Sequence, residues 1–518
     1  MSRIVRLAAL VVAALAVACS GEAGDASDAS VSINLEARPA SLAPAASGDH
    51  ATGTVLRQLF AGLVEYDATT GEPELLVAES VESDDNVTWT IELRDGWTFH
   101  DGSDVTAASF ADAWSVSATS PQHAALFEHV VGFGEIAMGE ADELAGVTVV
   151  DELTLEVELA RPFGPFPTAL GHVAFSPLPE AYFEDPEAFG EAPVGNGRYR
   201  FQADASDDER IVLERYDDYA GPIVGTPASI VFEVIENLST AYLEAQEGNL
   251  DILFQVPGDR EATAEDDFDG RVERSPISQL TFLGYPLYDE RFDDPDLRRA
   301  LSLAIDRQEI IDSLFDGAGE PATAIVPPVL DAHREGACDA CEFDPDAARD
   351  LYDAAGGIDG PVTLYYFPGG DNEEWVTAVA NQWVEHLGVT IDDGSFEAVG
   401  SDFFELASGQ QLTGPFQLGW ALEYLSPQYA LELYTSQSGF NFFGYASDAF
   451  DEAYADAVAT TGDEAEEGYL AAEDILLEDL PLIPMWYSQR TIVWGEGVQG
   501  VVMDPMGYVR VELVTLED

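Results

Sequence analysis

Segments with strand-like periodicity alternate with helical segments along this 518-residue chain, and no internal repeat is visible. Residues 87–93 and 153–159 carry apolar side chains at every second position, which is typical of strands with one buried face. Between them, residues 106–118 carry an apolar stripe at helical spacing, and Thr106 can cap that helix. A longer stripe at 294–317 predicts one long helix ending at a glycine. The chain is therefore predicted to be mixed α/β.

Length and composition indicate a globular protein with a substantial core. The chain is long enough for two or three domains, or for lobes that share a chain crossing back and forth. Hydrophobic residues make up 46% and aromatic residues 10%, which is too much for a disordered acidic chain even at a net charge of -77.

All 21 basic residues other than histidine are arginine, and the sequence contains no lysine. This excludes a phosphate-binding GxxxxGK[ST] loop, a Schiff-base lysine and a lysine general base. We also expect no nucleic-acid partner, because phosphate binding depends on clustered lysine and arginine. We interpret the acidic excess as an adaptation to a salty or alkaline medium, and surface drift in an acidic proteome is the alternative.

The N-terminus is predicted to be an export signal. Two arginines precede an apolar run at 7–18, which is too short for a spanning helix of about 20 residues. Small residues lead up to Cys19, as in a lipobox, so we expect a signal peptide at 1–18 and a lipidated Cys19 that begins a polar tether at 19–30. Without lipidation, Cys19 would be a spare thiol. We expect no other membrane-spanning run.

The two remaining cysteines, Cys338 and Cys341, form a CDAC motif. Zinc would need two further ligands, and none of the seven histidines lies at a suitable spacing. A small loop disulfide is the preferred interpretation for an exported protein, with a redox role as the alternative.

Six segments, in order, share motifs with one known family. They are WTFHDGSDVTAASFADAW at 97–114, the strand pair at 193–219, TAYLEAQEGNLDI at 240–252, DPDLRRALSLAIDRQEI at 294–310, GWALEYLSPQYALELY at 419–434 and NFFGYASDAFDEAYADA at 441–457. Together they resemble the family 5 extracellular solute-binding proteins, the oligopeptide and dipeptide receptors of ABC importers. The resemblance extends over roughly residues 31 to 515.

The resemblance implies a bilobal, periplasmic-binding-protein-like class II fold with an additional domain inserted in the first lobe. Ligand would be engulfed as the lobes close about a hinge. By this analogy, the first lobe comprises 31–58, 192–275 and 482–518, the extra domain 59–191, and the second lobe 276–481.

The resemblance also implies a ligand anchor at Glu423, because peptide-binding relatives hold the α-ammonium with an acid at this position. A carboxylate supplies the countercharge and the hydrogen bonds that a desolvated ammonium needs. The family usually has Asp there, and Glu reaches one methylene further. Its neighbours are apolar and aromatic, so we expect a dry cleft, although a solvated surface acid is the alternative.

Aromatic side chains are expected to form the walls of the same site. The candidates are Trp420, Tyr424, Trp486 and Tyr487, and core packing is the alternative for each. Gln417 stands where some peptide receptors place a basic residue for the ligand carboxylate, which leaves carboxylate recognition open.

The function expected from these features is capture of oligopeptides outside the cytoplasm by a monomer anchored to the membrane through Cys19. The partners are a peptide or other small-molecule ligand and the permease subunits of an ABC transporter. No cofactor, metal site or catalysis is expected, because GxSxG and HExxH motifs are absent and residues 265–276 do not complete a calcium loop. Binding of an oligosaccharide, or of a metal such as nickel, by the same fold is the alternative.

Overall fold

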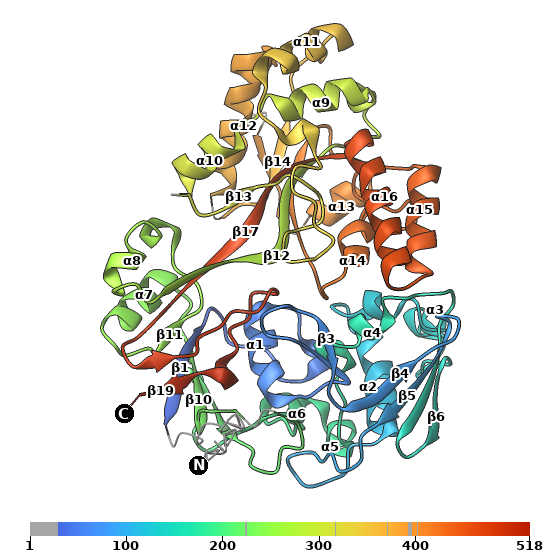
Figure 1. Ribbon diagram of the computed structural model, residues 1–518, viewed down its shortest axis with the longest axis vertical. Coiled ribbons are helices and arrows are strands. Elements are labelled where there is room, and N and C mark those ends of the chain that lie inside the picture. The colour runs from blue at the N-terminus through green and yellow to red at the C-terminus, as the bar shows by residue number, and fades with distance from the viewer. Residues whose placement is uncertain are drawn as a thin grey trace, which may run out of the picture.

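The computed structural model describes residues 29–222, 225–315, 317–369, 371–391, 396–400 and 402–517. The expected signal peptide at 1–18 and the expected lipidation site Cys19 lie outside these described residues. Figure 1 shows two bodies of mixed helices and strands, joined by two long strands that run from one body into the other.

The two connecting strands are β12 (Val272–Gly284) and β17 (Leu482–Trp494), and they pair antiparallel along their length. The register shifts where Pro276 lies opposite Gln489 and Leu280 lies opposite Tyr487. Three residues of β12 therefore lie opposite a single residue of β17. Such an excess bends a strand and increases its local twist, and the shift lies where the chain passes between the bodies.

One sheet continues from these strands into both bodies. On one side it contains β11 (Ile252–Leu253), β1 (Ser30–Leu35), β10 (Ser229–Val234), β9 (Arg210–Arg215) and β8 (Tyr199–Phe201). On the other side it contains β16 (Phe416–Ala421), β14 (Leu364–Tyr366) and β15 (Phe396–Ala398), while β13 (Glu320–Pro321) also pairs with β17. The bodies thus share a continuous hydrogen-bonded sheet.

A separate four-stranded antiparallel sheet is built from residues 78–158. Its order is β4 (Ala78–Glu82), β5 (Thr88–Leu93), β7 (Thr154–Glu158) and β6 (Val147–Asp151). The strand patterns predicted at 87–93 and 153–159 correspond to β5 and β7, which bury alternate side chains. The helix predicted after Thr106 is α2 (Ala107–Ser117), and Thr106 forms a capping box with Ser109.

The remaining elements cover the sheets and connect their strands. The body that contains β1 and the four-stranded sheet also holds β2 (Val64–Tyr66), β3 (Pro73–Leu75), β18 (Val498–Gln499), β19 (Thr515–Leu516), α1 (His50–Leu59), α3 (Phe133–Ala137), α4 (Phe166–Ala169), α5 (Glu180–Glu184), α6 (Pro186–Glu191), α7 (Leu238–Gln246) and α8 (Ala264–Asp267). The other body holds α9 (Pro295–Leu303), α10 (Arg307–Leu314), α11 (Pro345–Ala355), α12 (Asn372–Leu387), α13 (Phe403–Ser408), α14 (Pro427–Glu432), α15 (Asp448–Val458) and α16 (Asp463–Asp479).

The single long helix predicted at 294–317 is wrong, because α9 ends at Leu303 and α10 begins at Arg307. The Asp306 carboxylate caps α10 by accepting a hydrogen bond from the Glu309 N–H at 2.9 Å. The buried Arg307 guanidinium donates to the carbonyls of Ser302 and Ile305, which a continuous helix would use itself. Side-chain hydrogen bonds therefore replace one turn of main-chain bonds.

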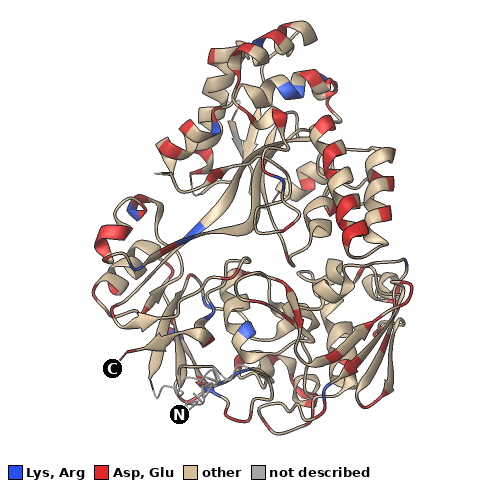
Figure 2. Ribbon diagram, viewed as in Figure 1, with Lys and Arg blue, Asp and Glu red and all other residues tan. Residues whose placement is uncertain are grey.

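Acidic side chains are distributed over the helices and loops of both bodies, whereas basic side chains are few and scattered (Figure 2). The core beneath is rich in aromatic residues, and its largest fully buried side chains include Trp114, Trp375 and Trp383. The charge excess is therefore compatible with an ordinary apolar core.

Candidate ligand-binding cleft

A cavity of about 320 Å³ lies where the two bodies and the chain around the four-stranded sheet meet. We call it the Glu423 cavity. It is lined by Asp49, His50, Arg57, Gln122, His123, His172, Ser278, Gln279, Ala421, Leu422, Glu423, Arg490, Met506 and Tyr508, among others. These residues come from α1 and its N-cap, from the segments that follow α2 and α4, from β12 and β17, from the end of β16 and the segment after it, and from the C-terminal segment after β18. The site therefore depends on how these elements assemble.

Glu423 lies just beyond β16, and its side chain reaches the cavity with 50% of its surface exposed. Its Oε2 is 3.1 Å from Nε2 of His172. The Ala174 N–H donates to Nδ1 of His172 at 3.1 Å, so Nε2 of the neutral ring carries the proton and donates to Glu423. The dry environment expected for this carboxylate is not present in this structure, because the cavity opens to solvent.

The pKa of Glu423 lies below its usual value. Burial acts to raise this pKa, but the hydrogen bond from His172, together with the positive charge of Arg57, outweighs burial. Glu423 is therefore ionised at neutral pH and available as a countercharge.

Arg57 and Arg490 supply the positive side of the same cavity. The Arg57 guanidinium lies 4.1 Å from the ring centre of Tyr508, and its Nε is buried without a hydrogen-bond partner. Arg57 forms no ion pair with any described residue, whereas Arg490 donates to His50 at 2.7 Å. Sequence reasoning missed Arg57, although a cation between Leu56 and Leu59 on an apolar helix is unusual in a chain this poor in cations.

A second cavity, of about 330 Å³, lies on the other side of the segment that carries Glu423. We call it the aromatic cavity. Trp420 stacks on Tyr429 with ring centres 5.6 Å apart, and Tyr424 packs against the same Tyr429 ring. Phe166 and Phe440 complete this apolar wall. Residues 420–424 thus contribute to two neighbouring cavities of different character.

Acidic and imidazole groups line the aromatic cavity where α14 meets the chain after the 3-10 helix at 124–127. Glu432 accepts a hydrogen bond from Gln428 at 2.7 Å, and burial together with the Glu128 charge raises the pKa of Glu432 to about 7. Burial also raises the pKa of Glu128. Burial, followed by the charge of Arg161, lowers the pKa of His129 to about 3, so this imidazole is neutral.

The structure brings together three of the predicted ligand residues and places the other two elsewhere. Glu423 lines one cavity, and Trp420 and Tyr424 line the neighbouring one. Trp486 packs in the core of the second body against Trp375, at 4.9 Å between ring centres, and is 7% exposed. Tyr487 is 1% exposed, and its hydroxyl donates to the Ala324 carbonyl. These two positions correspond to the core-packing alternative.

The Gln417 side chain is buried, and its Oε1 accepts a hydrogen bond from the Phe367 N–H at 3.0 Å. The Gln417 side-chain amide therefore accepts a hydrogen bond from a main-chain N–H between β14 and α12. A ligand carboxylate would have to find its positive partner elsewhere in the cleft.

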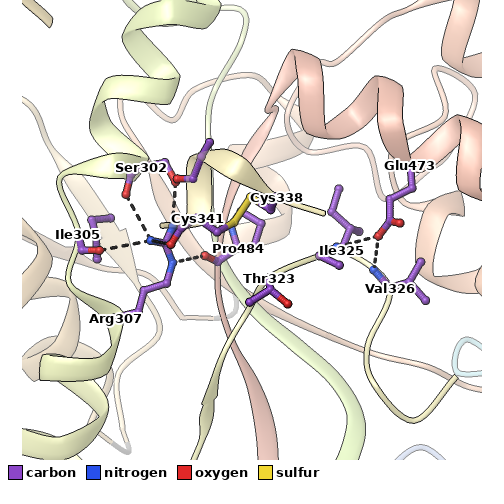
Figure 3. The surroundings of a disulfide bond; sticks show 12 residues. Ser302, Ile305, Arg307, Thr323, Ile325, Val326, Cys338, Cys341, Glu473 and Pro484 are labelled. Carbon is purple, nitrogen blue, oxygen red and sulfur yellow. Dashed lines mark hydrogen bonds between the residues drawn. A yellow bond between two sulfur atoms is a disulfide. The ribbon is translucent and has the colours of Figure 1, made fainter. Parts of the chain in front are cut away.

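The Cys338–Cys341 disulfide closes a loop that follows β13, with 5.3 Å between the Cα atoms (Figure 3). Glu473, fully buried on α16, accepts hydrogen bonds from the N–H groups of Ile325 and Val326, each at 2.9 Å (Figure 3). The loop is thus fixed to its own body at several points. Sequence reasoning missed Glu473, because nothing distinguishes it from its acidic neighbours on the helix.

Two bodies on a shared sheet, with a charged cleft between them, define the architecture of a solute-binding protein. The chain belongs to the bacterial extracellular solute-binding proteins of family 5, whose model matches residues 72–442. Members of this family bind solutes and are not enzymes.

Among relatives, the oligopeptide-binding protein OppA of Bacillus subtilis (strain 168) is 28% identical over 506 residues, which cover 92% of this chain and 91% of OppA. The glutathione-binding protein GsiB of Shigella dysenteriae serotype 1 (strain Sd197) is 26% identical over 507 residues, which cover 96% and 95%.

The unliganded open form of the periplasmic murein tripeptide-binding protein MppA superposes with a TM-score of 0.83 at 24% identity, covering 95% of this chain and 98% of MppA. This confirms the class II fold with an inserted domain. Within the part of the chain that the structure describes, every helix is too short or too polar to cross a membrane.

Proposed function

We propose that this protein captures short peptides in the Glu423 cavity and delivers them to the permease of an ABC importer. The observation that carries the proposal is the charge pattern of one cavity between the two bodies. An ionised carboxylate lies on one wall, and Arg57 and Arg490 lie on another. A peptide is a zwitterion whose two ends match these charges.

The peptide ammonium would bind Glu423. His172 occupies Oε2, and Oε1 makes no hydrogen bond to any described residue, which leaves an acceptor for the ligand. Closing the cleft would remove water around this pair and strengthen it. Truncating one partner of such a buried pair costs about 2 to 5 kcal/mol.

The peptide carboxylate would bind Arg57. Its guanidinium is stacked on Tyr508 and has no anionic partner within the described chain, so its fork can receive a carboxylate in bidentate geometry. Since Gln417 is engaged with the main chain, Arg57 is the better candidate. Relatives named as oligopeptide-binding and glutathione-binding proteins support a peptide ligand of this kind.

The test is calorimetry with a tripeptide in three forms: free, N-acetylated and C-amidated. Glu423→Gln is expected to weaken the free peptide about 30-fold or more and to leave the acetylated form unchanged, following the cost of a truncated pair. Arg57→Gln is expected to weaken the free peptide but not the amide. Glu464→Gln, on the exposed first turn of α16, is the matched control. Equal affinities for all forms and variants would exclude this peptide site.

A neutral oligosaccharide is the second candidate, because the stacked Trp420 and Tyr429 in the aromatic cavity offer a flat apolar surface for a sugar ring. Nickel, the remaining alternative from the sequence, would bind where histidines converge, and the rings of His123 and His172 lie 5.2 Å apart in the Glu423 cavity. Calorimetry with an oligosaccharide pool and with nickel chloride, beside the peptides, distinguishes the three ligands.

The same proposal includes the organisation inferred from the family. Lobe one comprises 31–58, 192–275 and 482–518, the extra domain 59–191, and lobe two 276–481. A signal peptide at 1–18 would direct export and be removed, and a lipid on Cys19 would hold the receptor, as a monomer, beside its permease. Cys19→Ser is expected to release the protein into the medium, and retention in the membrane fraction would contradict anchoring at this residue.

A further inference from the structure

Glu128, His129 and Glu432 bring three possible metal ligands together across the aromatic cavity. The first two follow the 3-10 helix at 124–127, and the third ends α14 on the opposite body. One ligand atom from each residue lies within 4.8 Å of the other two. Two carboxylates this close repel each other unless a proton or a cation lies between them.

The imidazole of His129 places a nitrogen ligand beside these two carboxyl groups. The residue is 8% exposed and stacks on Phe163, with 4.1 Å between ring centres. Its Nε2 makes no hydrogen bond to any described residue and lies 3.8 Å from Oε1 of Glu128, beyond hydrogen-bond distance. Because Arg161 donates to Nδ1, Nε2 of the neutral ring carries the proton, and a cation bound at Nε2 would move this proton to Nδ1 as Arg161 turns away.

The surroundings of Glu432 hold its carboxylate in one orientation. Gln428 is fully buried, and its amide donates to Oε2 of Glu432 at 2.7 Å. The Tyr424 hydroxyl donates in turn to the Gln428 carbonyl at 2.5 Å. Supporting hydrogen bonds of this kind orient the ligating carboxylates of metal sites, and here they leave Oε1 of Glu432 free to bind.

We propose that Glu128, His129 and Glu432 bind a divalent cation of the zinc type. Imidazole together with carboxylates suits zinc better than calcium or magnesium, which take oxygen ligands. Ligands bind zinc at about 2.0 to 2.2 Å, so their atoms need only a small inward movement from their present separation. Three protein ligands leave a fourth position open toward the aromatic cavity, where water or a ligand group can bind.

The bound cation would join the two bodies. Two of its ligands come from the chain between α2 and α3, and one comes from α14 of the other body. The cation therefore binds only when these elements meet, and its binding stabilises that arrangement by mass action. Arg161 competes with the cation, because its Nη2 lies 3.4 Å from Nδ1 of His129 and 3.7 Å from Glu128. Its side chain is 59% exposed and can turn outward into solvent.

The experiment titrates the metal-free full chain with zinc chloride in the calorimeter. We expect one tight site in the wild type, affinity at least about tenfold weaker in Glu432→Gln and in His129→Gln, and tighter binding in Arg161→Ala. The Glu464→Gln/Glu467→Gln variant, on the exposed start of α16, controls for weak binding to the acidic surface. Circular dichroism shows whether each variant is folded.

A tight site that is lost with His129 or Glu432 but kept in the surface control supports the proposal. Unchanged zinc affinity in both site variants overturns the proposal. A wild type that binds zinc no more tightly than the acidic surface also overturns it, and a shared proton would then link the two carboxyl groups. Arg161→Ala tests the site without removing a ligand. Because peptide binding is measured separately at Glu423, either proposal can fail alone.

Discussion

Replacing Glu473 with alanine should destabilise the second body strongly. The fully buried carboxylate accepts hydrogen bonds from the Ile325 and Val326 N–H groups at 2.9 Å each, and the change leaves both donors without an acceptor. Each unsatisfied buried donor costs about 1 to 3 kcal/mol. Arg334 also loses a partner at 2.8 Å but keeps Asp474 at 2.7 Å, and it is partly exposed, so it adds little.

The expected total loss for Glu473→Ala is therefore about 3 to 5 kcal/mol of unfolding free energy. Glu473→Gln keeps an oxygen for the two N–H groups and should lose only about 1 to 2 kcal/mol. Urea denaturation followed by tryptophan fluorescence measures both, with the exposed Glu467→Ala on the same helix as control. If Glu473→Ala unfolds within about 0.5 kcal/mol of this control, the carboxylate does not hold the loop.

Because the pKa of Glu423 is held below its usual value, peptide affinity should persist as the pH falls to about 4.5 and be lost only below that, which calorimetry against pH measures; loss already at pH 6 would contradict it. Replacing both cysteines, Cys338→Ser/Cys341→Ser, should lower the free energy of unfolding by only about 2 kcal/mol, because closing so short a loop removes little entropy from the unfolded chain. Urea denaturation of the wild-type protein with its disulfide reduced should show the same loss. With a net charge of -77, thermal stability should rise between low and molar salt, and an unchanged melting temperature would remove the interpretation of a salty habitat.

The spacing of apolar residues and the helix-capping residues predicted local structure correctly where no distant part of the chain competes for the main-chain hydrogen bonds. The strands around Trp89 and Leu155 and the helix capped by Thr106 form as their patterns indicate. The single helix at 294–317 was wrong, because the buried Arg307 takes carbonyls that the helix would need. The Arg307 guanidinium also donates to the carbonyls of Cys341 and Pro484, which are distant from it in the sequence.

The candidate site was predicted in part, for a physical reason. A motif placed Glu423 at a cleft, but the amount of water in that cleft depends on the separation of the two bodies. No local sequence pattern records this separation. Trp486 lies on a strand buried on both faces, so aromatic character could not distinguish a core position from a cavity wall. Arg57 and Glu473 were missed because the burial of a charged side chain depends on partners that are brought near only by folding.

The register shift between the long strands has a mechanical consequence for the cleft. Ser278 lies within the shifted stretch of β12, where its N–H donates to the Pro505 carbonyl and its own carbonyl accepts from the Leu422 N–H, both at 2.9 Å. Ser278 of β12 is thus hydrogen-bonded both to the C-terminal segment beside Tyr508 and to Leu422, the residue that precedes Glu423. Bending of β12 at this point would therefore move the wall that carries Glu423 relative to the wall that carries Arg57.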